Sequence, residues 1–233
     1  MQLRKLNRNE LKYLAIVAML IDHIAWGFVP LGSAAGQIMH FIGRLTGPTM
    51  AFFLAEGYQH THDRRRYALR LALFALISWP AFSWFEKGAP FTLNFSVIYT
   101  LFLGFLAILL WDRAPVARGW KLVGLIGLCL LSMPGDWGPF DVLWPVFLWQ
   151  FRDDPARKWR SFWIIAAAAV FSCIHWSRPL WTSIWVLGIL AVPPLLQFCY
   201  NGEPGSRHPF HKWVFYVFYP LHLLILAFLR WCI

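Results

Sequence analysis

Asp22 and His23 are the residues whose types and position best suit chemistry. They place an acid beside an imidazole in the middle of an otherwise apolar stretch that runs from Leu11 to Pro30. Ionisable side chains at bilayer depth are costly, so they usually carry out chemistry or carry ions. A neutral imidazole can accept a proton or attack a carbonyl carbon. The sequence therefore predicts a functional site inside the first apolar segment.

Lys12 precedes His23 by eleven positions, which is about 16 Å along a helix at ~1.5 Å per residue. Eleven steps of ~100° return to within ~20° of the starting direction, so the two side chains share a face. This separation is comparable with an extended pantetheine arm. A basic group at the rim could therefore hold coenzyme A phosphates while the thioester reaches the imidazole. Asp22 points roughly 100° away from His23 and needs another partner.

Arg44 is the predicted partner of Asp22, because it lies in the second apolar span and an unpaired guanidinium there would be very costly. Further polar residues fall at a similar depth. In the last apolar segment they follow at i+3 steps, at Tyr216, Tyr219 and His222. Ser78 falls in the same layer of the third span. Four predicted helices thus contribute polar groups to one plane.

Composition predicts an all-α, polytopic membrane protein. Of 233 residues, 59% are hydrophobic and only 14% are charged, which is too few for the surface of a soluble domain. The apolar runs have about the 20 residues that cross a ~30 Å hydrocarbon core. We predict about nine transmembrane helices, at 13–30, 38–57, 67–85, 95–111, 121–134, 139–151, 161–176, 180–199 and 213–231. The fifth and sixth are short and could instead form one re-entrant hairpin.

The formal charge of +10 follows from topology. With an N-in, C-out orientation, the outer side holds only Lys87, Arg178 and Arg230 of the 21 Lys and Arg residues. Arg44 lies within a span, and all the others face the cytoplasm, as the positive-inside rule requires. The basic character therefore gives no reason to expect nucleic acid. The whole chain, 1–233, is predicted to be a single transmembrane domain.

A cluster of polar and basic residues at the predicted cytoplasmic edge could line an entrance for phosphates. The residues that we assign to coenzyme A are Lys12, Glu56, His60, Arg64, Arg65, Arg66, Arg70, Asn201 and Arg207. His62, Gly202 and Lys212 lie beside them. The three consecutive arginines could also serve only as a topology anchor. The four cysteines are scattered, with neither metal-type spacing nor a disulfide framework, so we expect no metal.

Several segments resemble the TraX family, which takes its name from the F-type conjugative pilin acetylase. They are LKYLAIVAMLIDHIAW, FIGRLTGPTMAFFLAEGYQHTHDRRRYALRLALFALIS, LNFSVIYTLFLG, DWG, and YNGEPG followed by FYVFYPLHLLIL. The resemblance runs in order from about residue 11 to 227. It points to Asp22, His23, Gly43, Arg44, Pro48, Glu56, Gly57, His60, Thr61, Arg70, Ser78, Asn94, Asp136, Gly138, Asn201, Gly202, Gly205, Tyr219, Pro220 and His222.

The resemblance implies a multi-pass protein of the bacterial inner membrane, surrounded by lipid. Its expected activity is transfer of acetyl from acetyl coenzyme A to the N-terminal amine of a membrane-inserted pilin. The Lys12 and His23 pair is also similar to a basic residue and histidine in the first helix of larger membrane acyltransferases. One departure is that Trp79, Pro80 and Ala81 follow Ser78, where the TraX family often has an acidic residue and a Pro-Phe pair. Acceptor recognition can therefore differ.

The predicted mechanism makes His23 either the general base toward the acceptor amine or a covalent carrier of the acetyl group. Asp22 and Arg44 would brace the site, and Tyr219 and His222 would donate to the developing oxyanion. The alternative function is a small proton-coupled transporter or flippase, in which the ionisable groups relay protons. A structural assembly subunit is a third possibility. The absence of a clear inverted repeat argues against transport.

Overall fold

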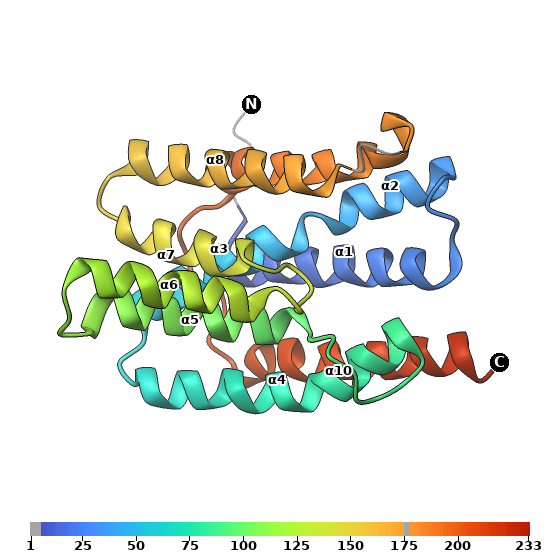
Figure 1. Cartoon of the computed structure of the whole chain (residues 1–233), viewed down its shortest axis with the longest axis horizontal. Helices are drawn as coiled ribbons and strands as arrows, with labels where there is room; N and C mark the ends of the chain where they lie inside the picture. The colour runs from blue at the N-terminus through green and yellow to red at the C-terminus, as the bar shows by residue number, and fades with distance from the viewer. Residues whose placement is uncertain (1–5, 175–177) are drawn as a thin grey trace. The chain divides into compact units, whose positions relative to one another are not determined.

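The computed structural model describes residues 6–174 and 178–233, and this part of the chain is helical throughout, with no β-strand (Figure 1). The elements in chain order are α1 (Arg8–Phe28), α2 (Ala34–Gly43), α3 (Thr46–His60), α4 (Arg64–Lys87), α5 (Val97–Arg113), α6 (Arg118–Ser132), α7 (Phe140–Gln150), α8 (Pro155–Cys173), the 3-10 helix η1 (Leu180–Ala191), α9 (Val192–Cys199) and α10 (Pro209–Trp231).

Four helical segments are long and apolar enough to cross a membrane. They are Arg8–Phe28, Arg64–Lys87, Leu180–Cys199 and Pro209–Trp231, counted over the described residues. They have 21, 24, 20 and 23 residues, which matches the roughly 20 residues that span a hydrocarbon core. The expectation of a helical membrane protein is therefore supported, whereas nine crossings and their orientation stay predictions.

The chain divides into two compact units, which we describe separately. The first unit comprises Met1–Met50 and Ala166–Ile233, and the second comprises Ala51–Ile165. In the first unit α1 packs against α2 and α10, and α2 also packs against η1. In the second unit α5 packs against α4, α6 and α7. That the whole chain forms a single domain stays a prediction.

The predicted span 38–57 is wrong as one continuous helix. Helix α2 ends at Gly43 and α3 begins at Thr46, so Arg44 lies at a break rather than within a span. Two interactions stabilise the break. Arg44 forms an ion pair with Asp22, and the Thr46 hydroxyl donates to the carbonyl of Ala15 at 2.9 Å. Pro48 then falls in the first turn of α3, where its missing N–H costs nothing.

The predicted span 180–199 is also not a single α-helix. It begins as the 3-10 helix η1 and becomes α-helical at Val192, where Pro193 and Pro194 occupy the first turn of α9. A 3-10 helix has three residues per turn, so side chains at i and i+3 align. Trp185 and Gly188 therefore lie on one ridge, and both are buried. This ridge packs against α2.

Helices α6 and α7 are two separate helices joined by residues 133–139. Their 15 and 11 residues correspond to about 22 and 16 Å at ~1.5 Å per residue, which is shorter than the hydrocarbon core. The fifth and sixth predicted spans are thus short in the structure as well, and whether each crosses the membrane stays a prediction. The predicted span 161–176 corresponds to α8, and its last residues lie outside the described part of the chain.

Candidate active site

Asp22 is the centre of a buried polar cluster between α1 and the end of α2. One carboxylate oxygen, Oδ2, accepts from Arg44 Nη2, and the other, Oδ1, lies 2.7 Å from His40 Nδ1. The predicted pairing of Asp22 with Arg44 is therefore present. Because both carboxylate oxygens accept charge-assisted or strong hydrogen bonds, the burial of Asp22 is compensated.

Two glycines allow the helices to approach closely enough for these bonds. A Cβ atom added to Gly43 would overlap the Asp22 side chain, so only glycine lets α2 lie against the carboxylate. A Cβ atom on Gly188 would overlap the carbonyl oxygen of Phe41 and press on Arg44. The close approach of α1 and η1 to α2 thus follows from the residue type at two positions.

His23 projects toward α10 and contacts His222. The distance from His23 Nδ1 to His222 Nε2 is 2.8 Å, and the two rings are stacked with centroids 5.0 Å apart. His222 Nδ1 lies 2.8 Å from the carbonyl oxygen of Phe218, which can only accept a hydrogen bond. His222 therefore carries a proton on Nδ1. When both rings are neutral, His222 Nε2 accepts from His23 Nδ1–H.

The predicted shared face of Lys12 and His23 is confirmed, because both side chains contact α10. Lys12 Nζ lies 5.5 Å from the ring centroid of Phe215, two turns before His222. Tyr219 is buried beside the imidazole, with its ring centroid 6.4 Å from that of His23. The structure thus places all five predicted catalytic residues on two neighbouring sides of α1. Tyr219 and His222 lie on the side of His23, and Arg44 lies on the side of Asp22.

His40 is a site residue that the sequence analysis did not select. It is fully buried, and its ring packs against those of Trp26 at 4.4 Å and Trp185 at 5.8 Å, which also contact each other at 5.9 Å. The Arg44 guanidinium also lies 4.9 Å from the Trp185 ring. An imidazole bonded to a carboxylate in an aromatic surround is typical of a positioned acid or base. The spacing of 18 residues between His40 and Asp22 becomes meaningful only when the break after α2 is known.

The predicted entrance residues of the first unit lie near the N-terminus of α1. Asn201 shapes the loop before α10, because its side-chain oxygen accepts from the backbone N–H of Glu203 at 2.8 Å. The Asn201 backbone donates to the carbonyl of Leu6, and Leu6 donates to Cys199. Gly202 and Gly205 have positive φ angles of 82° and 75°, which favour glycine. These family-pattern residues thus have a structural role, and Arg207 is exposed beside them.

Two of the predicted basic residues of the second unit, Arg64 and Arg66, have acidic partners within that unit. Arg64 lies 4.0 Å from Asp112, which also accepts from the Tyr58 hydroxyl at 2.7 Å. Arg66 pairs with Asp63 within the first turn of α4. Other residues of the predicted set have these placements: Arg65 is exposed, His60 is exposed at the end of α3, and the Arg70 guanidinium lies 4.9 Å from the Tyr67 ring.

Glu56 lies near a basic residue that the sequence analysis did not assign to ligand binding. Lys158 interacts electrostatically with Glu56, and its ammonium lies 4.8 Å from the Phe52 ring. Burial lowers the pKa of Lys158, and the Glu56 carboxylate opposes that shift. Glu56 and Lys158 are thus a further ionisable pair at the edge of the second unit.

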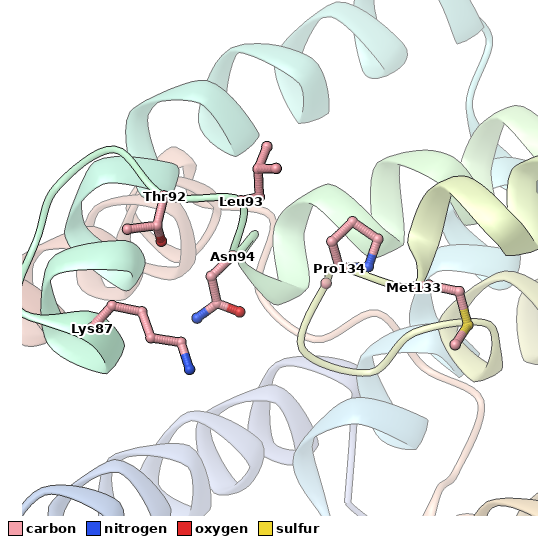
Figure 2. Close-up of a pocket in the computed structure, with 7 residues that line it drawn as sticks. Lys87, Thr92, Leu93, Asn94, Met133 and Pro134 are labelled. Carbon is pink, nitrogen blue, oxygen red and sulfur yellow. The ribbon is translucent and has the colours of Figure 1, made fainter.

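An open cavity of about 510 Å³ lies in the second unit, beside the loop that follows α4. Figure 2 shows Lys87 and Asn94 on one side and Met133 and Pro134 on the other. The loop is fixed by a hydrogen bond from the Phe95 backbone to Pro134 and by one from Trp79 Nε1 to Thr92. Asn94, a family-pattern residue, therefore lines a cavity of this unit rather than the Asp22 cluster.

Ser78 and Asp141 are buried polar side chains of the second unit. Ser78 is buried in α4, as expected for a polar residue in the third span, and its hydroxyl has no hydrogen-bond partner among the described residues. Asp141 is fully buried in α7 and accepts from Thr100 Oγ1 at 2.8 Å. Asp141 was missed because it stands alone among apolar residues. No group of three or more His, Cys, Asp or Glu residues suited to a metal ion occurs in the described part of the chain.

Comparisons with known proteins agree with the motif pattern. The family model described as TraX protein matches residues 7–230. The chain is similar to the probable fimbrial assembly protein FimC, serogroup H1, of Dichelobacter nodosus, with 32% identity over 94% of this chain and 93% of that protein. No solved structure matches the chain.

Proposed function

Since this chain belongs to the TraX protein family, we propose that it is a membrane acetyltransferase that acts in pilus assembly. The acetyl donor is acetyl coenzyme A from the cytoplasm, and the acceptor is an amine, namely the N-terminus of a membrane-inserted pilin subunit. The family and the similarity to a fimbrial assembly protein support a pilin partner. The enzymatic step is our proposal from the geometry of the site.

The observation that carries the proposal is the hydrogen-bonded pair of His23 and His222. The Phe218 carbonyl fixes a proton on His222 Nδ1, and His222 Nε2 then fixes a proton on His23 Nδ1. A neutral His23 therefore carries its basic lone pair on Nε2. This arrangement orients an imidazole for proton transfer or nucleophilic attack, as the third group of a catalytic triad does.

In the proposed reaction His23 Nε2 takes a proton from the attacking amine, or it first attacks the thioester carbon and carries the acetyl group. Both routes break the C–S bond and form an amide, with a proton returned to the coenzyme A thiolate. Tyr219 supplies a hydroxyl for the developing oxyanion. The bonding of His222 favours orientation of His23 over the predicted donation to that oxyanion, because its Nδ1 proton is directed at Phe218.

The proposed topology has about nine crossings with the N-terminus in the cytoplasm and the C-terminus outside, in the bacterial inner membrane. Lys12 is then at the cytoplasmic end of α1. Its neighbour on α10, Phe215, lies two turns before His222, the neighbour of His23. Coenzyme A phosphates would be held there by Lys12 and Arg207. In the second unit Arg65 and Arg66 are exposed, and their role as coenzyme A contacts stays a prediction from the sequence.

The test is the variant His23→Ala, purified in detergent and mixed with acetyl coenzyme A and a synthetic peptide that has an apolar membrane segment and a free N-terminal amine. Mass spectrometry measures acetylated peptide and released coenzyme A. We expect a loss of at least about a hundredfold, the usual value of a general base. His62→Ala, at an exposed histidine, is the matched control. Retention of turnover within about tenfold would remove His23 from the chemical step.

The interrupted helix at Arg44 favours one competing function, proton-coupled transport. Transporters often place ion sites where a helix is broken near the membrane midplane. Binding of acetyl coenzyme A separates the two functions without an acceptor, because a ligand raises the thermal stability of a protein that binds it. A thermal shift with acetyl coenzyme A supports the transferase. Absence of binding at millimolar concentration would favour the transporter.

A further inference from the structure

His40 presents a second oriented imidazole, on the Asp22 side of α1, which is next to the side that carries His23. Its Nδ1 lies 2.7 Å from Asp22 Oδ1, and the second oxygen of Asp22 accepts from Arg44. A carboxylate that accepts from both neighbours fixes the His40 proton on Nδ1. The lone pair of a neutral His40 is then on Nε2. A carboxylate, an imidazole and a basic Nε2 are the parts of an acid–base couple.

The Nε2 atom of His40 is buried and has no hydrogen-bond partner among the described residues. The same is true of Nε1 of Trp185, whose ring is next to that of His40. Buried polar atoms without a hydrogen-bond partner are rare because each has lost its bonds to water without replacement. His40 Nε2 is an acceptor in the neutral ring, and Trp185 Nε1–H is a donor. Together they suit a group that both donates and accepts, such as a water molecule or a hydroxyl group.

The proton balance of acetyl transfer requires a second base, if the acceptor is an amine as proposed above. An N-terminal amine with a pKa of about 8 arrives mainly as an ammonium ion at neutral pH. It must lose one proton to become a nucleophile and a second proton when the amide forms. The second proton returns to the coenzyme A thiolate through His23. One imidazole cannot hold both protons, so the first needs another acceptor.

We propose that His40, oriented by Asp22, is that acceptor. The acceptor ammonium gives one proton to His40 Nε2, directly or through a bridging water that also accepts from Trp185 Nε1–H. The resulting amine attacks the thioester carbon, the C–S bond breaks, and the second N–H proton passes through His23 to the thiolate. His40 then releases its proton to solvent. The net products are an acetamide, coenzyme A and one proton.

The surroundings of His40 fit this role. Asp22 from α1 stabilises the imidazolium, and Arg44 at the end of α2 keeps Asp22 ionised. The two rings that pack on His40, Trp26 from α1 and Trp185 from η1, are uncharged and have faces that attract cations. His23 is the neighbouring titratable group on α1, and it is directed toward α10.

The test is His40→Asn, because the asparagine amide can replace Nδ1–H toward Asp22 but has no basic nitrogen in place of Nε2. Acetyl transfer to the same synthetic peptide is measured at pH 6.5 and pH 9, with a thermal melt to show that the variant is folded. At pH 6.5 only about 3% of an amine with a pKa near 8 is neutral, and at pH 9 about 90% is. We expect a rate loss of about 10- to 30-fold at pH 6.5 that falls below about threefold at pH 9.

Two controls make the result specific. His23→Asn should be defective at both pH values, because His23 handles the proton that is lost during attack. His40→Gln also lacks a basic nitrogen and should show the same rescue at high pH if His40→Asn is poorly folded. A defect of His40→Asn that is equal at both pH values, or unfolding of both His40 variants, would show that His40 is only structural. Absence of transfer by the unmodified protein would instead overturn the proposed function on which this inference rests.

Discussion

Arg44 in the first unit and Arg66 in the second unit form the same kind of ion pair in opposite surroundings. Arg44 and Asp22 have side chains that are only 11% and 8% exposed. Arg66 and Asp63 are 87% and 48% exposed and are joined within the first turn of α4. The buried pair connects α1 to the end of α2, whereas the exposed pair connects residues three positions apart. The buried pair therefore specifies tertiary structure, and the exposed pair specifies only local structure.

The energetic reasons differ in the same way. Burial of a charge costs several kcal/mol, so removal of one partner leaves a large uncompensated penalty in the other. Water already solvates an exposed pair, and such a pair contributes about 0–1 kcal/mol. We therefore expect a large loss of stability when the buried pair is broken and almost none when the exposed pair is broken.

The variant Arg44→Leu leaves the Asp22 carboxylate buried with His40 as its remaining hydrogen-bond partner among the described residues. We expect the free energy of unfolding to fall by about 3–5 kcal/mol, as for other broken buried pairs. Denaturant unfolding in detergent measures this change. The matched variant Arg66→Leu should leave stability almost unchanged. Equal losses in the two variants would contradict the distinction between the regions.

The variant Gly43→Ala tests whether the close approach of α2 to Asp22 is required. Its methyl group would overlap the Asp22 side chain, so we expect a loss of about 1–3 kcal/mol from overpacking. Gly127→Ala in α6 is the control, because an added Cβ atom there has no neighbour within 4 Å. That control should be neutral or slightly stabilising, since alanine favours a helix over glycine by about 1 kcal/mol. Thermal melts of the two variants give the comparison.

Asp112 provides an intermediate case in the second unit, with a side chain that is 21% exposed. It accepts from the Tyr58 hydroxyl and from Arg113, and Arg64 lies nearby. We expect Asp112→Ala to lower the free energy of unfolding by about 1 kcal/mol, a usual net value for lost hydrogen bonds. A loss as large as that of Arg44→Leu would show that the exposed side of this cluster is not solvated.

The triple variant in which Arg64, Arg65 and Arg66 become lysine should have the smallest effect on the fold. Lysine satisfies the positive-inside rule, so membrane insertion should be unchanged. Lysine cannot form the forked hydrogen bonds that arginine makes to phosphate. We therefore expect an apparent KM for acetyl coenzyme A that is raised severalfold, measured by coenzyme A release. An unchanged KM would assign these arginines to topology alone and direct attention to Lys12 and Arg207.

The Asp22 and Arg44 pair could be predicted because the cost of an isolated charge in an apolar segment demands a partner. The shared face of Lys12 and His23 could be predicted because a continuous helix has a fixed period. His40 could not, because its role depends on a break that residue periodicity does not reveal. The Thr-Gly-Pro sequence at 46–48 was the available signal, since proline favours the first turn of a helix.

The helical class of the fold follows from composition, whereas two details depend on tertiary packing. The 3-10 form of η1 has an apolar sequence that suits an α-helix equally well, and its ridge of Trp185 and Gly188 is selected by packing on α2. The partner of Arg64 is Asp112, on another helix, so local sequence does not indicate that the arginine is engaged. Tertiary contacts of this kind override local propensity.

The contact between His23 and His222 also bears on biosynthesis. These residues are 199 positions apart, so α1 leaves the ribosome long before α10 exists. At about 5–20 residues per second, translation of the intervening chain takes roughly 10–40 s. During that interval His40 and Arg44 are already available to Asp22, but His23 has no histidine opposite it. The nascent protein therefore acquires its charge-compensated core early and an oriented His23 only when synthesis is nearly complete.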